Sequence, residues 1–173
     1  MIPLSASAIA AIVEGTLVGD DGEISGAAAI NSSLVEHGGI FFALLGQRVD
    51  GHEYVGDAFS HGAVLAITSQ PVKCRHIEVK DVATALTTLA RYVRSQLVDL
   101  KVIGITGSQG KTTAKDLLRH LLSQHGQTVA PTGNYNNELG VPLTILQCDR
   151  STRYAIIEMG ARHTGDIAYL ASI

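Results

Sequence analysis

A glycine-rich turn between an apolar run and an amphipathic segment constrains this fold more than any other feature of the sequence. Residues 102–106 have the pattern of a buried strand, and residues 112–124 have the spacing of a helix. The turn between them reads Gly-Ser-Gln-Gly-Lys-Thr-Thr at residues 107–113. One face of the helix is expected to be buried, and its members are Ala114, Leu117, Leu118, Leu121 and Leu122. The segment therefore predicts one strand–turn–helix unit of a parallel α/β sheet.

The residues that follow repeat the alternation of strands and helices. Short strands are expected over residues 128–130 and 154–158, with a helix over residues 138–147 between them. Strands that alternate with helices predict a parallel sheet with right-handed crossovers. Three strands are few for a doubly wound sheet, and the chain ends at Ile173 inside what the pattern predicts is another helix. We therefore expect residues 100–173 to be the start of a larger, truncated domain.

The first half of the chain has a different sequence pattern, with short apolar runs and many glycines. Ser5 is expected to cap a short helix. The expected strands are residues 27–30, 40–45, 63–68 and 75–79, and a second helix is expected over residues 53–60. This pattern predicts a small mixed α/β domain over residues 1–81. A helix with one apolar side is expected to connect it to the second domain over residues 82–99.

The composition is that of a soluble globular protein. Hydrophobic residues make up 46% of the chain and charged residues 17%, which excludes a disordered segment or a fibrous repeat. The formal net charge is −3, so a broad basic surface for nucleic acid is not expected. The longest unbroken apolar run covers residues 40–45, far short of the roughly 20 residues of a membrane span. With two isolated cysteines, Cys74 and Cys148, the sequence predicts a cytoplasmic protein that contacts neither nucleic acid nor membrane.

The glycine-rich turn has the residues needed to bind a phosphate chain. Gly107 and Gly110 allow the backbone to curl around anionic oxygens, and the N–H groups at the start of the helix face them. The Lys111 ammonium can reach the β- and γ-phosphates, and the Thr112 hydroxyl can ligate Mg²⁺. The strict phosphate-loop pattern has its first glycine where this chain has Ile105, so the loop is a variant. The alternative is an ordinary turn that carries a lysine by chance.

Two further polar segments lie where expected strands end. Glu158 closes the strand of residues 154–158, and its carboxylate could hold Mg²⁺ directly or through water. Taken alone, such a glutamate is more often a helix cap or one half of an ion pair. Residues 132–143 contain three asparagines around Tyr135, which is typical of a turn that opens a helix. A contact between this loop and a nucleotide or substrate is the second interpretation.

Several of these segments closely resemble the Mur ligase family. The similar stretches are GGIFFALLGQRVDGHEYV at residues 38–55, ITGSQGKTT at 105–113, GNYNNELGVPLT at 133–144 and EMGARHTGDIAYL at 158–170. The phosphate loop alone is shared with folylpolyglutamate synthetases, whereas NNELGVPLT and EMGA point to the ligases that add D-alanyl-D-alanine to UDP-N-acetylmuramoyl-tripeptide. The resemblance implies a small mixed α/β N-terminal UDP-binding domain followed by an incomplete parallel-sheet P-loop ATPase domain.

The resemblance also implies ATP-dependent amide formation. ATP would phosphorylate the terminal carboxylate of UDP-N-acetylmuramoyl-tripeptide, and the amine of D-alanyl-D-alanine would attack the acyl phosphate. Because this chemistry brings anions together, Lys111, the loop amides and Mg²⁺ would neutralise them. Lys111 is therefore the expected catalytic residue, and Thr112 and Glu158 are the expected magnesium ligands. The expected ATP-binding residues are Gly107, Ser108, Gln109, Gly110, Lys111, Thr112, Thr113, Asn134 and Asn137.

The resemblance assigns the UDP half of the substrate to the first domain. The candidate residues are Ser32, Ser33, Gly46, Gln47, Arg48, Asp50, Gly51 and His52. The Arg48 guanidinium could pair with the diphosphate, and Gly46 and Gly51 would permit close backbone approach. Family members often carry Asp-Ser-Arg or Asp-Thr-Arg where this chain has Asn-Ser-Ser at residues 31–33. In the alternative interpretation, Arg48 is a solvated loop charge and His52 a hydrogen-bonded surface histidine.

Family members carry parts that residues 1–173 do not include. These are a further central stretch with a carbamylated lysine that supports a second magnesium, and a C-terminal domain that closes over ATP. We therefore expect this chain to be a monomer that forms no amide bond by itself. His163 follows Glu158, but it is expected to lie at the exposed start of a helix rather than to act as a base. A stand-alone nucleotide-binding module, folate polyglutamylation and another acceptor within the family are the competing interpretations.

Overall fold

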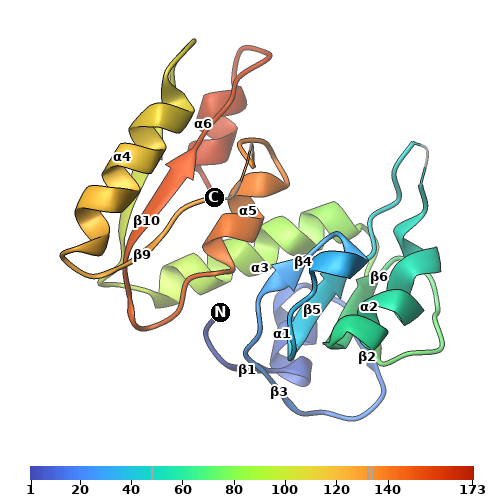
Figure 1. Cartoon of the computed structure of the whole chain (residues 1–173). Coiled ribbons are helices and arrows are strands. Elements are labelled where there is room, and N and C mark those ends of the chain that lie inside the picture. The colour runs from blue at the N-terminus through green and yellow to red at the C-terminus, as the bar shows by residue number, and fades with distance from the viewer. Residues whose placement is uncertain (48, 132, 134) are drawn as a thin grey trace. The chain divides into compact units, whose positions relative to one another are not determined.

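The computed structural model describes residues 1–47, 49–131, 133 and 135–173 (Figure 1). The chain divides into two compact units, Met1–Leu89 and Ala90–Ile173. The division falls within helix α3 (Val82–Gln96), the segment that the sequence analysis takes as the connection. The expected α/β class, with parallel strands in both units, is confirmed.

The first unit is built on a five-stranded mixed sheet with the strand order β2-β7-β6-β5-β4. Its strands are β2 (Thr16–Val18), β4 (Ala28–Ala29), β5 (Gly39–Phe42), β6 (Ala63–Thr68) and β7 (His76–Glu78). Neighbours from β4 to β7 run parallel, and β2 runs antiparallel to β7. A separate two-stranded ladder joins β1 (Leu4–Ser5) and β3 (Glu23–Ile24).

The helices of the first unit are short; the first has the predicted cap, and the second begins at Val55 rather than at the predicted residue 53. Ser5 caps α1 (Ala6–Ile12), because its Oγ accepts a hydrogen bond from the Ala8 amide over 3.1 Å. The 3₁₀ turn η1 (Ser32–Leu34) follows β4, and a second one, η2 (Gly51–Tyr54), leads into α2 (Val55–His61). Val55 and Ala58 of α2 are buried in a core cluster with Phe41 of β5 and Ala66 of β6. This packing fixes the carboxyl ends of β4, β5 and β6 and the loops that leave them.

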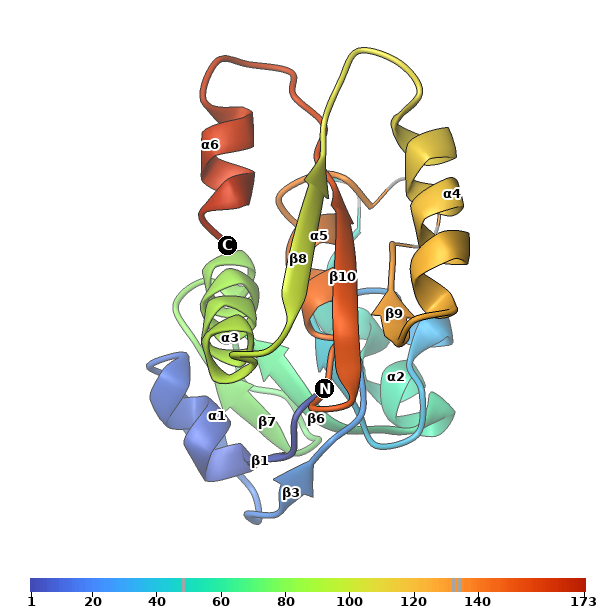
Figure 2. The ribbon, with the colours of Figure 1, turned by 90° about the vertical axis from the view of Figure 1, so that its left-hand side faces the viewer.

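The second unit contains a three-stranded parallel sheet with the order β8-β10-β9. Its strands are β8 (Lys101–Ile105), β9 (Gln127–Val129) and β10 (Thr152–Glu158). Helix α4 (Lys111–Ser123) lies on one side of this sheet, and α5 (Gly140–Ile145) and α6 (Asp166–Ala171) lie on the other (Figure 2). Parallel strands place their carboxyl ends at one edge, so the glycine-rich turn, the asparagine loop and Glu158 meet there.

Two expectations about burial in the second unit are wrong. Leu117 and Leu121 of α4, expected to face inward, are 61% and 57% exposed, and the buried side chain of this helix is Lys115. The run 102–106, expected to be a buried strand, forms a half-exposed β8 with Val102 38% exposed. The reason is the width of the sheet: β8 stands at its edge, and three strands do not cover the whole apolar side of α4.

None of the helices in the described part of the chain has the length and hydropathy that a membrane-spanning segment needs.

Candidate nucleotide-binding site

The glycine-rich turn forms an open loop between β8 and α4. Gly110 has a φ of 78°, in the left-handed region that favours glycine, and it immediately precedes the first residue of α4. Because Gly110 has no side chain that could cap the helix, the first backbone N–H groups of α4 face outward from the helix terminus. An anion placed there would meet these donors and the positive end of the helix dipole.

Lys111 lies over this loop. Its Nζ donates a hydrogen bond to the Gly107 carbonyl oxygen over 2.6 Å, which brings the ammonium back across the turn. The neighbouring candidates Ser108, Gln109 and Thr113 are all exposed at the same surface. The loop therefore places a cation and several backbone donors around one open space, as a bound polyphosphate requires.

Glu158 lies beside the loop and joins three elements. The residue is 2% exposed and stands at the end of β10. Its Oε2 accepts a hydrogen bond from Thr112 Oγ1 over 3.3 Å, and its Oε1 accepts one from Asn136 Nδ2 over 3.0 Å. The structure thus brings together the two predicted magnesium ligands and adds Asn136, which the sequence analysis does not single out. The signal for Asn136 was its place in the asparagine loop, but the sequence does not tell its three asparagines apart.

Asn137 of the same loop has a different role from Asn136. Asn137 Oδ1 accepts hydrogen bonds from the backbone amides of Leu139 and Gly140, over 3.3 and 2.9 Å, so it holds the start of α5. This interaction explains why the helix begins at Gly140 rather than at residue 138. Asn134 lies outside the described residues. A contact of either residue with ATP stays a prediction.

The oxygen atoms at Glu158 and Thr112 fit a magnesium ion. Mg²⁺ prefers oxygen ligands and commonly takes one or two from the protein, with phosphate oxygens and waters as the rest. Thr112 Oγ1 and the Glu158 carboxylate supply such oxygens next to the phosphate loop. Among the described residues, no three His, Cys, Asp or Glu side chains come close enough to hold a metal by themselves. The arrangement therefore fits an ion that arrives with a nucleotide better than a metal held by the protein alone.

The candidates for binding UDP lie at the carboxyl ends of neighbouring parallel strands in the first unit. Ser32 is 7% exposed and Ser33 is exposed, both in η1 after β4. Asn31 caps this turn, since its Oδ1 accepts hydrogen bonds from the Ser33 amide over 3.1 Å and the Ser33 hydroxyl over 2.9 Å. Gly46 and Gln47 lie in the exposed loop after β5. Arg48 lies outside the described residues.

His52 uses both of its ring nitrogens within the first unit. Its Nδ1 lies 2.6 Å from Asp50 Oδ1, and its Nε2 accepts a hydrogen bond from the Ser69 amide over 3.0 Å. Because Nε2 is an acceptor, the proton of the neutral ring is on Nδ1 and points to Asp50. The backbone N–H of His52, followed by its ring, holds the pKa of the Asp50 carboxyl below its usual value. This geometry favours the interpretation of His52 as a hydrogen-bonded residue that links η2 to the end of β6.

The protein backbone around Gly51 leaves no room for a side chain, so a glycine is needed here whether or not a ligand binds. A Cβ at this position would lie 2.6 Å from the Leu44 carbonyl oxygen and 2.7 Å from the Leu44 nitrogen. We expect Gly51→Ala to lower the free energy of unfolding by about 1–3 kcal/mol, because backbone atoms must move apart. Gly56→Ala is the matched control in α2: its Cβ meets open space, so it should raise stability by about 0.5–1 kcal/mol. Urea unfolding of both variants measures the difference. Equal effects of the two substitutions would contradict this account of Gly51.

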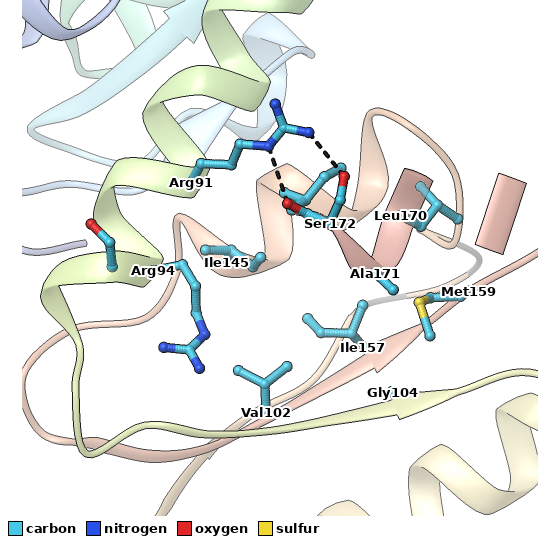
Figure 3. Close-up of a pocket in the computed structure, with 12 residues that line it drawn as sticks. Arg91, Arg94, Val102, Gly104, Ile145, Ile157, Met159, Leu170, Ala171 and Ser172 are labelled. Carbon is cyan, nitrogen blue, oxygen red and sulfur yellow. Dashed lines mark hydrogen bonds between the residues drawn. The ribbon is translucent and has the colours of Figure 1, made fainter. Parts of the chain in front are cut away.

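A pocket of about 620 Å³ lies within the second unit, away from the phosphate loop (Figure 3). From the sheet it is lined by Val102, Gly104, Ile157 and Met159, and Figure 3 shows Arg91 reaching Ser172 at its rim. These strand residues alternate with Ile103, Ile105 and Glu158, so the pocket opens on the face of the sheet opposite to α4. It is mainly apolar and does not belong to the candidate phosphate site.

His163 lies at the surface before α6, as the sequence analysis expects. Its backbone amide and that of Arg162 each donate a hydrogen bond to Asp166 Oδ2 over 2.8 Å. These two bonds hold the pKa of the Asp166 carboxyl below its usual value. The segment is therefore an exposed turn at the start of α6, held by a carboxylate.

The parallel sheet, the glycine-rich loop before α4 and the acidic residue at the end of β10 define an α/β protein with the strand–loop–helix arrangement that a phosphate loop requires. A family profile described as "Mur ligase middle domain" matches residues 105–173, and one described as "Mur ligase family, catalytic domain" matches residues 27–94. The chain belongs to the Mur ligase family.

Curated relatives with the same name are similar to the whole of this chain. Two proteins named UDP-N-acetylmuramoyl-tripeptide–D-alanyl-D-alanine ligase, from Mycobacterium tuberculosis (strain ATCC 25618 / H37Rv) and Escherichia coli (strain K12), are 39% and 37% identical to this chain. The alignments cover all of this chain but 40% and 38% of those proteins. The chain thus spans about two fifths of the length of the curated relatives it matches.

Solved structures of MurF ligases are also similar to this chain. A crystal structure of MurF from Acinetobacter baumannii matches 98% of this chain with a TM-score of 0.84 at 36% identity, over 38% of that protein. The MurF ligase of Thermotoga maritima in complex with ADP matches 85% of this chain with a TM-score of 0.69 at 35% identity, over 35% of that protein. The strand order that the sequence leaves open therefore has counterparts in known Mur ligases.

Proposed function

We propose that this chain supplies the UDP-substrate domain and part of the ATP-binding domain of a ligase that joins D-alanyl-D-alanine to UDP-N-acetylmuramoyl-tripeptide. The observation that carries the proposal is the Thr112–Glu158 pair beside an open phosphate loop. Support comes from the similarity of the whole chain to ligases with that activity in their names.

The roles of the phosphate loop follow from its charges. Lys111 would leave the Gly107 carbonyl and pair with the β- and γ-phosphates of ATP, while the amides of residues 107–113 would donate to the same oxygens. Thr112 and Glu158 would hold Mg²⁺, which supplies charge neutralisation when it is bound. Asn134 and Asn137 remain candidates for contacts with the nucleotide.

Transfer of the γ-phosphate requires positive charge and N–H donors from the loop. The terminal carboxylate of the tripeptide attacks the γ-phosphorus, ADP leaves, and the amine of D-alanyl-D-alanine then displaces phosphate from the acyl phosphate. Two anions must approach one another in the first step, so a nearby cation and oriented N–H donors lower its barrier. Lys111 is the proposed cation, and its hydrogen bond to the Gly107 carbonyl oxygen across the loop supports this role.

The first unit would hold the nucleotide end of the peptide substrate. Three loops leave neighbouring parallel strands at one edge of its sheet, after β4, β5 and β6. The candidates lie in the first two of these loops and are Ser32, Ser33, Gly46, Gln47, Arg48, Asp50 and Gly51. His52 links the loop after β5 to Ser69 at the end of β6. A cytoplasmic monomer that contacts neither membrane nor nucleic acid is part of the same proposal.

Calorimetry of the 173-residue chain tests this assignment. We expect one binding event for a non-hydrolysable ATP analogue with Mg²⁺ and a separate one for UDP-N-acetylmuramoyl-tripeptide. Tetrahydrofolate, the substrate type of the folate interpretation, should give no heat. With ATP and both ligase substrates present, phosphate release should stay at background, because the relatives are more than twice as long. Binding of the folate instead of the UDP-linked peptide would overturn the substrate, and turnover would overturn the expected need for further domains.

A further inference from the structure

The second unit buries a lysine that the proposed function does not use. Lys115 of α4 is 4% exposed, whereas Leu117 and Leu121 of the same helix are more than half exposed. Placing a cation in a protein interior is costly unless hydrogen bonds and charges compensate it. An apolar side chain of similar length would fill the same space at a lower cost. Packing therefore does not explain a lysine at this position.

Lys115 joins α4 to the loop that follows β9. Its Nζ donates a hydrogen bond to the Pro131 carbonyl oxygen over 3.2 Å. It also lies 3.3 Å from Asp116 Oδ1, but that side chain is 61% exposed, so water weakens the ion pair. Pro131 is buried and stands two residues beyond the end of β9. The ammonium therefore fixes the point at which the chain leaves the sheet and enters the asparagine loop.

The same loop is held at its other end by Glu158. Asn136 Nδ2 donates to Glu158 Oε1 over 3.0 Å, and the Asn136 carbonyl oxygen accepts from the Gly160 amide over 2.8 Å. Thr112 donates to the other oxygen of Glu158. Because Thr112 and Lys115 are three residues apart on α4, they lie on the same side of the helix. One side of α4 is thus linked to Glu158 twice, directly by Thr112 and indirectly by Lys115 through the loop.

We propose that Lys115 is a positioning residue that holds Asn136 against Glu158 and so fixes the direction of the Glu158 carboxylate. The inference rests on the proposed function, because that carboxylate is the proposed magnesium ligand. Groups that orient a metal-ligating carboxylate typically change the metal affinity by about 10- to 100-fold when they are removed. Lys115 acts on Glu158 only through Asn136. We therefore expect removal of its ammonium to change the metal affinity by about tenfold, the lower end of this range.

Two substitutions on the same helix separate this role from a general effect on α4. Lys115→Met keeps most of the unbranched side chain and removes the ammonium, and Arg119→Met changes an exposed residue one turn further on. Calorimetry measures the affinity for a non-hydrolysable ATP analogue, once with Mg²⁺ and once with EDTA. We expect Lys115→Met to weaken binding by about tenfold in Mg²⁺ and by less than about twofold in EDTA, with Arg119→Met unchanged in both. Equal losses in Mg²⁺ and EDTA, or no loss, would overturn the proposal.

A double-mutant cycle tests whether Lys115 acts through Asn136. Asn136→Ala should reproduce the loss of Mg²⁺-dependent affinity, and the combination with Lys115→Met should add little to it, because both break one chain of contacts. Lys115→Arg retains a charged donor and should recover part of the lost affinity. Fully additive losses would show that the two residues act independently and would contradict the inference.

A measurement on the unmutated chain covers the case in which Lys115→Met does not fold. In ¹⁵N NMR spectra without nucleotide, the Lys115 ammonium and the Asn136 side-chain amide should exchange slowly with water, because both are hydrogen-bonded. Fast exchange of either group would overturn the proposal. This readout needs no ligand. A chain that shows slow exchange but binds no ATP would refute the proposed function and leave the link between Lys115 and Asn136 intact.

Discussion

Replacing Lys111 with alanine is expected to weaken binding of an Mg²⁺-bound ATP analogue by about 100-fold or more while leaving the fold intact. Hydrogen bonds to charged groups contribute about 1.5–3 kcal/mol each, and an ammonium shared between two phosphate oxygens makes two of them. In the absence of ligand, the Lys111 ammonium donates a hydrogen bond to the Gly107 carbonyl oxygen within an exposed loop. The free energy of unfolding should therefore change by no more than about 0.5 kcal/mol.

Isothermal calorimetry and thermal unfolding of the same preparation measure these two effects. Arg119→Ala is the control, because it removes an exposed positive charge from the same helix at a distance from the loop. Its affinity should match that of the unmutated chain. If Lys111→Ala lowered the melting temperature strongly without ligand, Lys111 would be a structural residue. If both variants bound the analogue equally well, the loop would not be a phosphate site.

Glu158→Gln is expected to remove most of the dependence of nucleotide binding on Mg²⁺. The substitution keeps the shape of a side chain that is 2% exposed, and a glutamine can still accept from Asn136 and donate to Thr112. The fold should therefore be retained, while the negative charge that attracts the ion is lost. We expect affinity in Mg²⁺ to fall by about 10- to 100-fold and affinity in EDTA to stay unchanged.

A titration series at increasing Mg²⁺ concentration shows this effect directly. Glu138→Gln provides the control, since Glu138 belongs to the neighbouring loop and is exposed. It removes the same charge without touching the Thr112 hydroxyl. A Glu158→Gln variant that responds to Mg²⁺ as strongly as the unmutated chain would exclude Glu158 as a magnesium ligand. A similar loss in both variants would indicate a general effect of net charge.

The strand–turn–helix around residues 107–113 could be predicted from the sequence because its signals are local. An apolar run, two glycines and an amphipathic helix follow one another without interruption. The meeting of Thr112 and Glu158 could also be predicted, although 46 residues separate them, because parallel strands end at one edge of a sheet. Both predictions depend on general rules of α/β folds rather than on details of packing.

The contacts that the sequence did not predict are set by the paths of loops and by the width of the sheet. Asn136, rather than its neighbours, reaches Glu158 because the loop after β9 is held at both ends. His52 meets Ser69 because β5 and β6 are adjacent strands, an order that propensities do not give. The burial of Lys115 in place of Leu117 depends on how much sheet lies under α4. Such features follow from tertiary structure and have no local pattern.

A crystal structure of this chain with Mg²⁺ and a non-hydrolysable ATP analogue tests the central claim most directly. We predict that the β- and γ-phosphates occupy the loop of residues 107–113, that Lys111 Nζ has moved from the Gly107 carbonyl to a phosphate oxygen, and that Mg²⁺ lies between the phosphates and Glu158. A bound analogue whose phosphates lie elsewhere, with the Lys111–Gly107 hydrogen bond unchanged, would contradict the assignment of this turn as a nucleotide site.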